Sequence, residues 1–243
     1  MFALYYAKEG INVGFTTKVR KMSIFFEIAK GTALFSGLEE EEIEHMLNCF
    51  YEKKKKIGKN EFIYRAGEGT PVAGMVISGS VLVIKEDFWG NQNIIVKIGE
   101  GQIFGETYGC LPTQPMDVSI LTAEPTEILL LDIGKILKTC PVPCPFHEKL
   151  INNLLEDMAR KNIVHTRKIE FLSQRTTREK LLSYLSAESI AKNNSKFTIQ
   201  FNRQQLADYL AVDRSAMSNE LSKLKDDGII SFHKNFFELK EKQ

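Results

Sequence analysis

Residues 201–225 read FNRQQLADYLAVDRSAMSNELSKLK, and the interpretation of the whole chain starts from them. Two short apolar stripes at helical spacing, separated by Ala211-Val212, predict two short helices joined by a tight turn. Asn202 and Asp213 stand where an N-cap residue belongs, before each helix. Two short helices joined in this way are typical of a helix-turn-helix, whose second helix enters the major groove of DNA.

The flanking sequence extends this motif to a winged helix. Residues 178–189 predict a preceding helix, and residues 228–239 predict two strands around a turn at His233-Lys234-Asn235. An ordinary pair of surface helices is the alternative interpretation. The polar positions expected to contact DNA are Asn202, Arg203, Gln204, Arg214, Ser215, Ser218, Asn219, Lys223 and Lys234.

Composition sets limits on the class of protein. The chain has 243 residues, 43% apolar and 26% charged, with a net charge of +1, which suits two globular domains. Residues 173–243 hold 12 Lys and Arg against 9 Asp and Glu, so DNA affinity must come from placed phosphate contacts. We expect no signal peptide and no membrane span, and four irregularly spaced cysteines favour a reducing, cytoplasmic setting.

Residues 57–132 consist of short β-rich runs separated by glycines. They predict a jelly-roll-like antiparallel β-roll (a double-stranded β-helix) with strands near Glu61–Tyr64, Gly74–Ile77, Val81–Glu86, Ile94–Ile98 and Glu127–Asp132. Residues 24–29 and 39–50 before the roll predict helices. The run Lys53-Lys-Lys-Lys56 predicts a solvated strand edge, with a nucleic-acid contact as the alternative.

A long helix is predicted beyond the proline-rich residues 140–145, ending near Leu172. Its seam alternates spacings of four and three, as in a coiled coil, which predicts a homodimer interface. We expect Asn162 and His165 of the seam to fix the register of the two helices or to lie next to a ligand. We do not expect them to bind a metal. The interface residues are Ile151, Leu155, Met158, Asn162, His165, Ile169 and Leu172.

The order of these parts resembles the Crp/Fnr family of transcription regulators. The resemblance covers residues 25–239 and rests on motifs at Gly58–Gly67, Val76–Val81, Gly101–Glu106 and in the helix-turn-helix. It implies an α+β chain that binds double-stranded DNA as a homodimer at a pseudo-palindromic operator and contacts RNA polymerase. The implied divisions are an N-terminal extension (1–22), a cyclic-nucleotide-binding-like effector domain (23–145), a dimerisation helix (146–172) and a winged helix-turn-helix (173–243).

The sequence departs from the resemblance at the positions that would hold an effector. In members that bind cyclic AMP, the Gly-Glu pair is followed by an Arg and a Ser or Thr that hold the cyclic phosphate, whereas this chain has Met116 and Asp117 there. Because Asp117 repels an anionic phosphate, we expect an effector other than cyclic AMP, of open identity. The expected effector positions are Gly105, Glu106, Thr107, Tyr108, Met116 and Asp117.

Departures also affect the operator and the cofactor. Ser215 and Asn219 replace the family's frequent Glu and Arg, while Arg214 suits guanine and Asn219 suits adenine, so we expect a different half-site. The N-terminal cysteine cluster of the oxygen-sensing members is absent, so no iron–sulfur cofactor is expected.

Other classes of function remain as rivals. Four scattered histidines, with no P-loop, nucleophile elbow or HExxH motif, give no support to an enzyme. Cys140 and Cys144, with Cys110 as a third candidate, could form a redox sensor, or they are plain hinge cysteines. A roll kept only as a scaffold, without an effector, is the remaining alternative.

Overall fold

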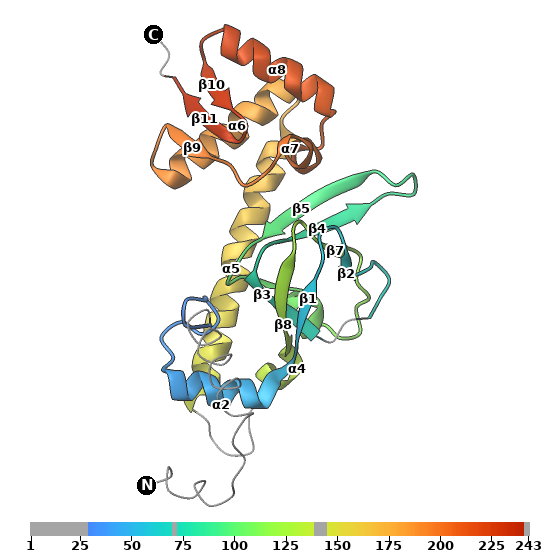
Figure 1. The fold of residues 1–243 in the computed structure, drawn as a ribbon, viewed down its shortest axis with the longest axis vertical. Helices are drawn as coiled ribbons and strands as arrows, with labels where there is room; N and C mark the ends of the chain where they lie inside the picture. Colours follow the sequence, from blue (N-terminus) through green and yellow to red (C-terminus); the bar gives the residue numbers. More distant parts are fainter. Residues whose placement is uncertain (1–28, 70–71, 139–144, 241–243) are drawn as a thin grey trace, which may run out of the picture.

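A computed structural model describes residues 29–69, 72–138 and 145–240. Figure 1 shows a β domain and a smaller C-terminal domain joined by one long helix. The β domain has two antiparallel sheets, each with four strands. The first has the order β1 (Tyr51–Ile57), β8 (Thr126–Asp132), β3 (Val72–Ser78) and β6 (Ile103–Phe104). The second has the order β2 (Phe62–Tyr64), β7 (Ser119–Thr122), β4 (Val81–Glu86) and β5 (Gln92–Ile98).

Strands β3 and β8 are buried on both faces, which explains their continuous apolar sequences. Val76, Ile128 and Leu130 point into a core that also receives residues of the second sheet. Alternate residues such as Met75 and Leu129 point to the opposite face, against α2 (Glu40–Phe50), α4 (Ile133–Leu137) and the long helix α5 (Pro145–Ser173). This is the jelly-roll-like arrangement predicted from the sequence.

The turn between β3 and β4 requires glycine. Gly79 has φ +84°, and a Cβ there would lie 2.6 Å from the Pro125 carbonyl oxygen. The strand-turn-strand motif Val76–Val81 therefore depends on this one residue for its tight turn.

Strand β1 is an exposed edge, as the lysine run predicted. The Lys54 and Lys56 ammonium groups lie 2.9 and 3.5 Å from a Glu127 carboxylate oxygen on neighbouring β8. The lysine run thus keeps the free edge of the sheet in contact with water. The helix predicted over residues 24–29 lies almost wholly outside the described residues, as do Cys140 and Cys144.

Helix α5 has 29 residues and begins and ends close to the predicted positions. Ile151 and Met158 pack partly against the core of the roll, and Leu172 is half-buried. Leu155, Asn162, His165 and Ile169 are exposed along one line of the helix. The seam therefore has an uncovered apolar side in the single chain. No helix within the described ranges is long and apolar enough to cross a membrane.

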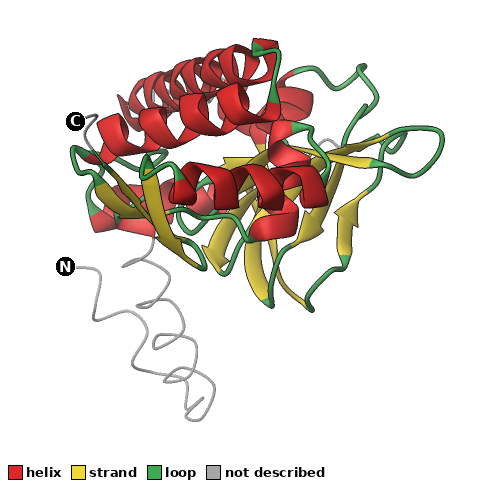
Figure 2. Cartoon of the chain, turned by 90° about the horizontal axis from the view of Figure 1, so that it is seen from above, coloured by secondary structure: helices red, strands yellow, loops and turns green. Residues whose placement is uncertain are grey.

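The C-terminal domain combines three helices with a small sheet, seen from above in Figure 2. Its helices are α6 (Thr177–Lys192), α7 (Arg203–Leu210) and α8 (Arg214–Asp226). Its strands pair in the order β10 (Ile230–His233), β11 (Phe236–Leu239) and β9 (Lys196–Thr198). The turn between β10 and β11 contains Lys234 at φ +50°, as the predicted wing requires. The sequence prediction missed β9.

Candidate functional site

The first candidate site is the exposed face of α8. Asp213 caps the helix, with its Oδ1 accepting from the Ala216 amide at 2.8 Å. One side of α8 is buried in the domain core through Met217, Leu221 and Leu224. The rest of the helix surface is exposed, and it carries four predicted DNA-binding residues: Arg214, Ser215, Ser218 and Asn219.

The start of α7 carries three more predicted contacts, which differ in their surroundings. Asn202 is the N-cap, and its Oδ1 accepts from the Gln205 amide at 2.9 Å. Gln204 is exposed, and its amide nitrogen donates to Asp208 at 2.8 Å. The Arg203 guanidinium instead lies 4.8 Å from the ring centre of Phe232 in the wing, and burial lowers its pKa. Arg203 thus packs α7 against the wing.

The two remaining predicted cations lie at the edges of this surface. Lys223 is exposed, with its ammonium 2.8 Å from the Glu220 carboxylate on the same helix. Lys234 is exposed at the tip of the wing. The described residues therefore present a polar recognition face on α8, flanked by α7 and the wing.

The second candidate site is a cavity of about 330 Å³ between the β-roll and α5. Its walls come mainly from β5, the β6–α3 segment and α5, where α3 spans Glu106–Cys110. About half of the lining residues are apolar: Val83, Ile95, Val96, Ile98, Phe104, Val118, Ile120 and Val164. The polar residues that line it are Lys97, Gln102, Glu106, Thr107, Tyr108, Lys161, His165 and Gln200.

Four of the predicted effector residues line this cavity and two do not. Gly105, Glu106, Thr107 and Tyr108 belong to its wall. Met116 is instead 2% exposed, inside the core between the sheets. Asp117 lies outside the cavity, exposed on the surface.

Asp117 is held by two side chains. It accepts a hydrogen bond from the Tyr108 hydroxyl, and its Oδ2 lies 3.0 Å from the Lys85 ammonium. These contacts, that with Tyr108 first, hold the pKa of Asp117 below its usual range. Burial, followed by the bond to Asp117, raises the pKa of Tyr108 to about 12. At neutral pH the pair is therefore an ionised carboxylate and a neutral phenol.

Glu106 faces a cation that the sequence analysis did not identify. Its Oε1 lies 2.8 Å from the Lys161 ammonium of α5, which also donates to the Ile103 carbonyl oxygen at 2.7 Å. Glu106 is 5% exposed, so this ion pair joins the cavity wall to the long helix in a mostly buried setting. The two partners are 55 positions apart in the sequence, which explains why no sequence pattern indicated the pair.

His165 lines the cavity from α5. Partial desolvation lowers the pKa of its imidazole, and the nearby charge of Lys168 lowers it further. No group of three or more potential metal ligands occurs among the residues that the structure describes.

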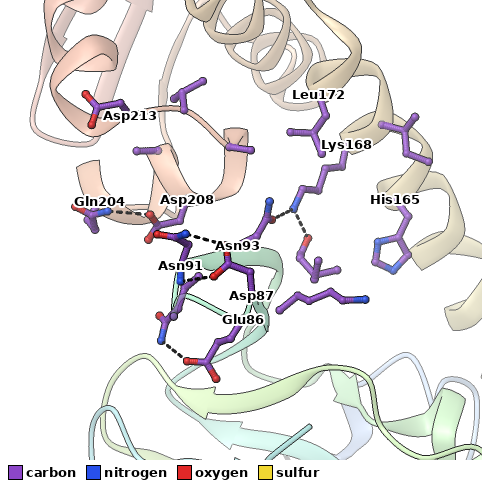
Figure 3. A pocket seen from close by; sticks show the side chains of 18 residues that line it. Glu86, Asp87, Asn91, Asn93, His165, Lys168, Leu172, Gln204, Asp208 and Asp213 are labelled. Atoms are coloured by element: carbon purple, nitrogen blue, oxygen red, sulfur yellow. Dashed lines mark hydrogen bonds between the residues drawn. The ribbon is translucent and has the colours of Figure 1, made fainter.

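A wider groove of about 1140 Å³ separates the β4–β5 hairpin from α7 and the start of α8 (Figure 3). Figure 3 shows Glu86, Asp87 and Asn91 on the hairpin side and Gln204 and Asp208 on the opposite side. The C-terminal domain therefore lies next to the β-roll as well as on the end of α5.

Comparisons with known proteins agree with this architecture. Residues 54–140 match the family model of the cyclic nucleotide-binding domain, and residues 179–242 match that of the Crp-like helix-turn-helix domain. The cyclic AMP receptor protein of Thermus thermophilus is 24% identical over 215 residues, which cover 87% of this chain and 94% of that protein.

Two solved structures share the fold at low sequence identity. The c-di-GMP-responsive global regulator CLP of Xanthomonas campestris has a TM-score of 0.67 and 18% identity, over 84% of this chain and all of that one. A mutant of CooA from Carboxydothermus hydrogenoformans has a TM-score of 0.64 and 18% identity, over 81% of this chain and 86% of that one.

The two matched domains define a DNA-binding transcription regulator with a domain of the cyclic-nucleotide-binding type. The chain belongs to the Crp/Fnr family of transcription regulators. The resemblance and the α+β fold class predicted from the sequence are thereby confirmed.

Proposed function

We propose that this regulator binds a pseudo-palindromic operator as a homodimer and responds to an effector other than cyclic AMP. The observation that carries the proposal is the recognition face of α8, where Arg214, Ser215, Ser218 and Asn219 are exposed while an apolar stripe of the same helix is buried in the domain core. Side chains at these positions can reach base edges in the major groove.

The uncovered seam of α5 supports the dimer. Leu155 and Ile169 are 59% and 67% exposed, and they are separated by two heptads. Apolar side chains repeated at this spacing pack against the same stripe of a second helix. Twofold symmetry would then place two recognition helices on half-sites about one helical turn, ~34 Å, apart.

The cavity chemistry supports an effector that is not a cyclic nucleotide. Among the described residues that line the cavity there is no arginine to hold a phosphate, and Lys161 is already paired with Glu106. The exposed Asp117 carboxylate lies outside the cavity, bound to Lys85 and Tyr108. The apolar side chains of the walls, together with neutral polar groups such as those of Gln102, Thr107 and Gln200, favour a small ligand that is partly apolar.

Effector and DNA binding would be linked through α5. A ligand that binds one placement of this helix more tightly than another shifts the population toward it, and operator affinity changes with it. As a DNA-binding regulator of this family, the protein would work in the cytoplasm and contact RNA polymerase.

Selection of genomic fragments with the purified full-length protein, followed by footprinting, tests the proposal. We expect a symmetric protected site with two half-sites, and weaker binding to it by an Arg214→Ala variant. No enriched site, with or without cell extract as a source of effector, would refute specific DNA binding. Unchanged binding by the variant would refute the assignment of α8 as the recognition helix.

A further inference from the structure

Lys168 is a buried lysine on α5 that contacts the β-roll. It is 5% exposed, and its ammonium donates to the Ile94 carbonyl oxygen, lies 3.2 Å from Asn93 Oδ1 and lies 3.4 Å from the Ile95 carbonyl oxygen. Strand β5, which carries all three acceptors, is the edge strand of its sheet, and a bulge interrupts its pairing with β4 here. The ammonium therefore supplies donors to a strand edge that has no neighbouring strand.

The same ammonium contacts the helix-turn-helix. It lies 4.6 Å from the centre of the Tyr209 ring on α7, close enough for a cation–π contact. Tyr209 is 7% exposed and stacks on Phe201, with 4.6 Å between ring centres. One side chain thus joins the β-roll, the long helix and the first helix of the DNA-binding motif. Figure 3 shows Lys168 and its contact with Asn93.

Burying this charge is costly, because no carboxylate among the described residues forms an ion pair with Lys168. Burial lowers the pKa of Lys168 to about 8, so the group is still mainly protonated at neutral pH. The cost of desolvation is offset by the carbonyl oxygens, the side-chain amide of Asn93 and the ring of Tyr209. All of these groups contact the ammonium only while β5, α5 and α7 stay together. The lysine therefore favours one relative placement of the two domains.

Two further features hold the domains in this placement. Leu82, Ile84 and Ile94 of the roll share one apolar cluster with Phe171 and Phe201. The Lys97 ammonium on β5 donates to the Gln200 carbonyl oxygen at 3.0 Å. The recognition face of α8 is exposed in this arrangement, so the joined domains are in an orientation that leaves α8 open to DNA.

We propose that Lys168 is an interdomain latch that holds α7 against the bulged edge of β5 and so fixes the recognition helix in its DNA-competent orientation. Ile95, Val96 and Ile98 of β5 line the effector cavity, on the same strand whose carbonyl oxygens Lys168 binds. A ligand that shifts β5 changes the latch directly. The DNA part of this inference rests on the proposed function, whereas the contact between the domains does not.

Hydrogen exchange measured by mass spectrometry on the full-length protein, together with fluorescence anisotropy on the selected operator, tests the latch. In Lys168→Met we expect exchange to become at least tenfold faster in both β5 and α7, with β3 and β8 unchanged, and operator affinity to fall about tenfold. The matched control is Arg167→Met, which removes an exposed charge from the adjacent position of α5 and should match the wild type.

If β5 and α7 of the Lys168→Met variant exchange hydrogen at the wild-type rate, the proposed latch is wrong. If that variant loses its cooperative thermal transition, Asn93→Ala, which removes one acceptor only, decides instead. In Asn93→Ala the hydrogen-exchange rate of α7 should rise a few fold, and an unchanged rate would overturn the proposal. A wild-type protein that binds no selected DNA refutes the proposed function, while the exchange comparison still decides the latch.

Discussion

Replacing Ile169 by alanine removes an apolar side chain from the exposed seam of α5, where the proposed dimer would bury it. Ile169 is 67% exposed in the single chain. Full burial of an isoleucine side chain contributes about 1.5–3 kcal/mol, so the exposed two-thirds corresponds to about 1–2 kcal/mol per copy. Each substitution occurs twice in a twofold dimer, which doubles the effect to about 2–4 kcal/mol.

This loss corresponds to self-association that is roughly 30- to 1000-fold weaker, at about 1.4 kcal/mol per factor of ten. Sedimentation equilibrium of the wild type and of Ile169→Ala measures it directly. Ile190 is the matched control, because it is an isoleucine of α6 that is 76% exposed and lies outside the seam. An unchanged dimer dissociation constant in Ile169→Ala, or an equal loss in Ile190→Ala, would refute the seam as the interface.

Four further results are expected. Lys161→Met should lower the free energy of unfolding by about 3 kcal/mol in urea, because it leaves the buried Glu106 carboxylate without its partner; a change below about 1 kcal/mol would contradict this. Asn202→Ala should cost about 1 kcal/mol in thermal denaturation through loss of the N-cap, and an unchanged midpoint would contradict the cap. Arg214→Ala should cost about 1–3 kcal/mol of operator binding while non-specific binding changes little; an equal loss on both DNAs would indicate a phosphate contact. Calorimetry should detect no binding of cyclic AMP at millimolar concentration, and saturable binding would refute the effector proposal.

The C-terminal domain could be predicted in detail because its signals are local in the sequence. Asn202 and Asp213 cap the helices that they precede, since a cap depends on residues only three positions away. The wing turn at Lys234 follows from its immediate neighbours in the same way. Strand β9 was missed because its three residues are too few to show alternation, and it is defined by pairing with the distant β11.

The candidate effector site was predicted less completely, since its residues meet only in the folded chain. Gly105–Tyr108 line the cavity as expected, but Met116 points into the core. The neighbouring Asp117 is exposed, and Lys85 and Tyr108 hold its carboxylate at the surface. Lys161 and Lys168 were missed because their partners lie 55 and more than 70 residues away.

These two lysines show how α5 can connect the sites. They are seven residues apart, so they lie on one face of the helix, which also includes the buried Leu154 and Phe171 and points to the chain's own domains. Most seam residues follow a residue of this buried stripe by one position, about 100° around the helix, whereas His165 follows the exposed Val164. The seam could be predicted from the sequence because most of its residues are apolar. The buried stripe could not, because it contains Lys161 and Lys168. Helix α5 therefore contacts its own domains on one stripe and would contact its partner on the adjacent stripe. A rotation of α5 that breaks the Glu106 or β5 contacts must also displace the dimer seam, so a ligand in the cavity would change both together.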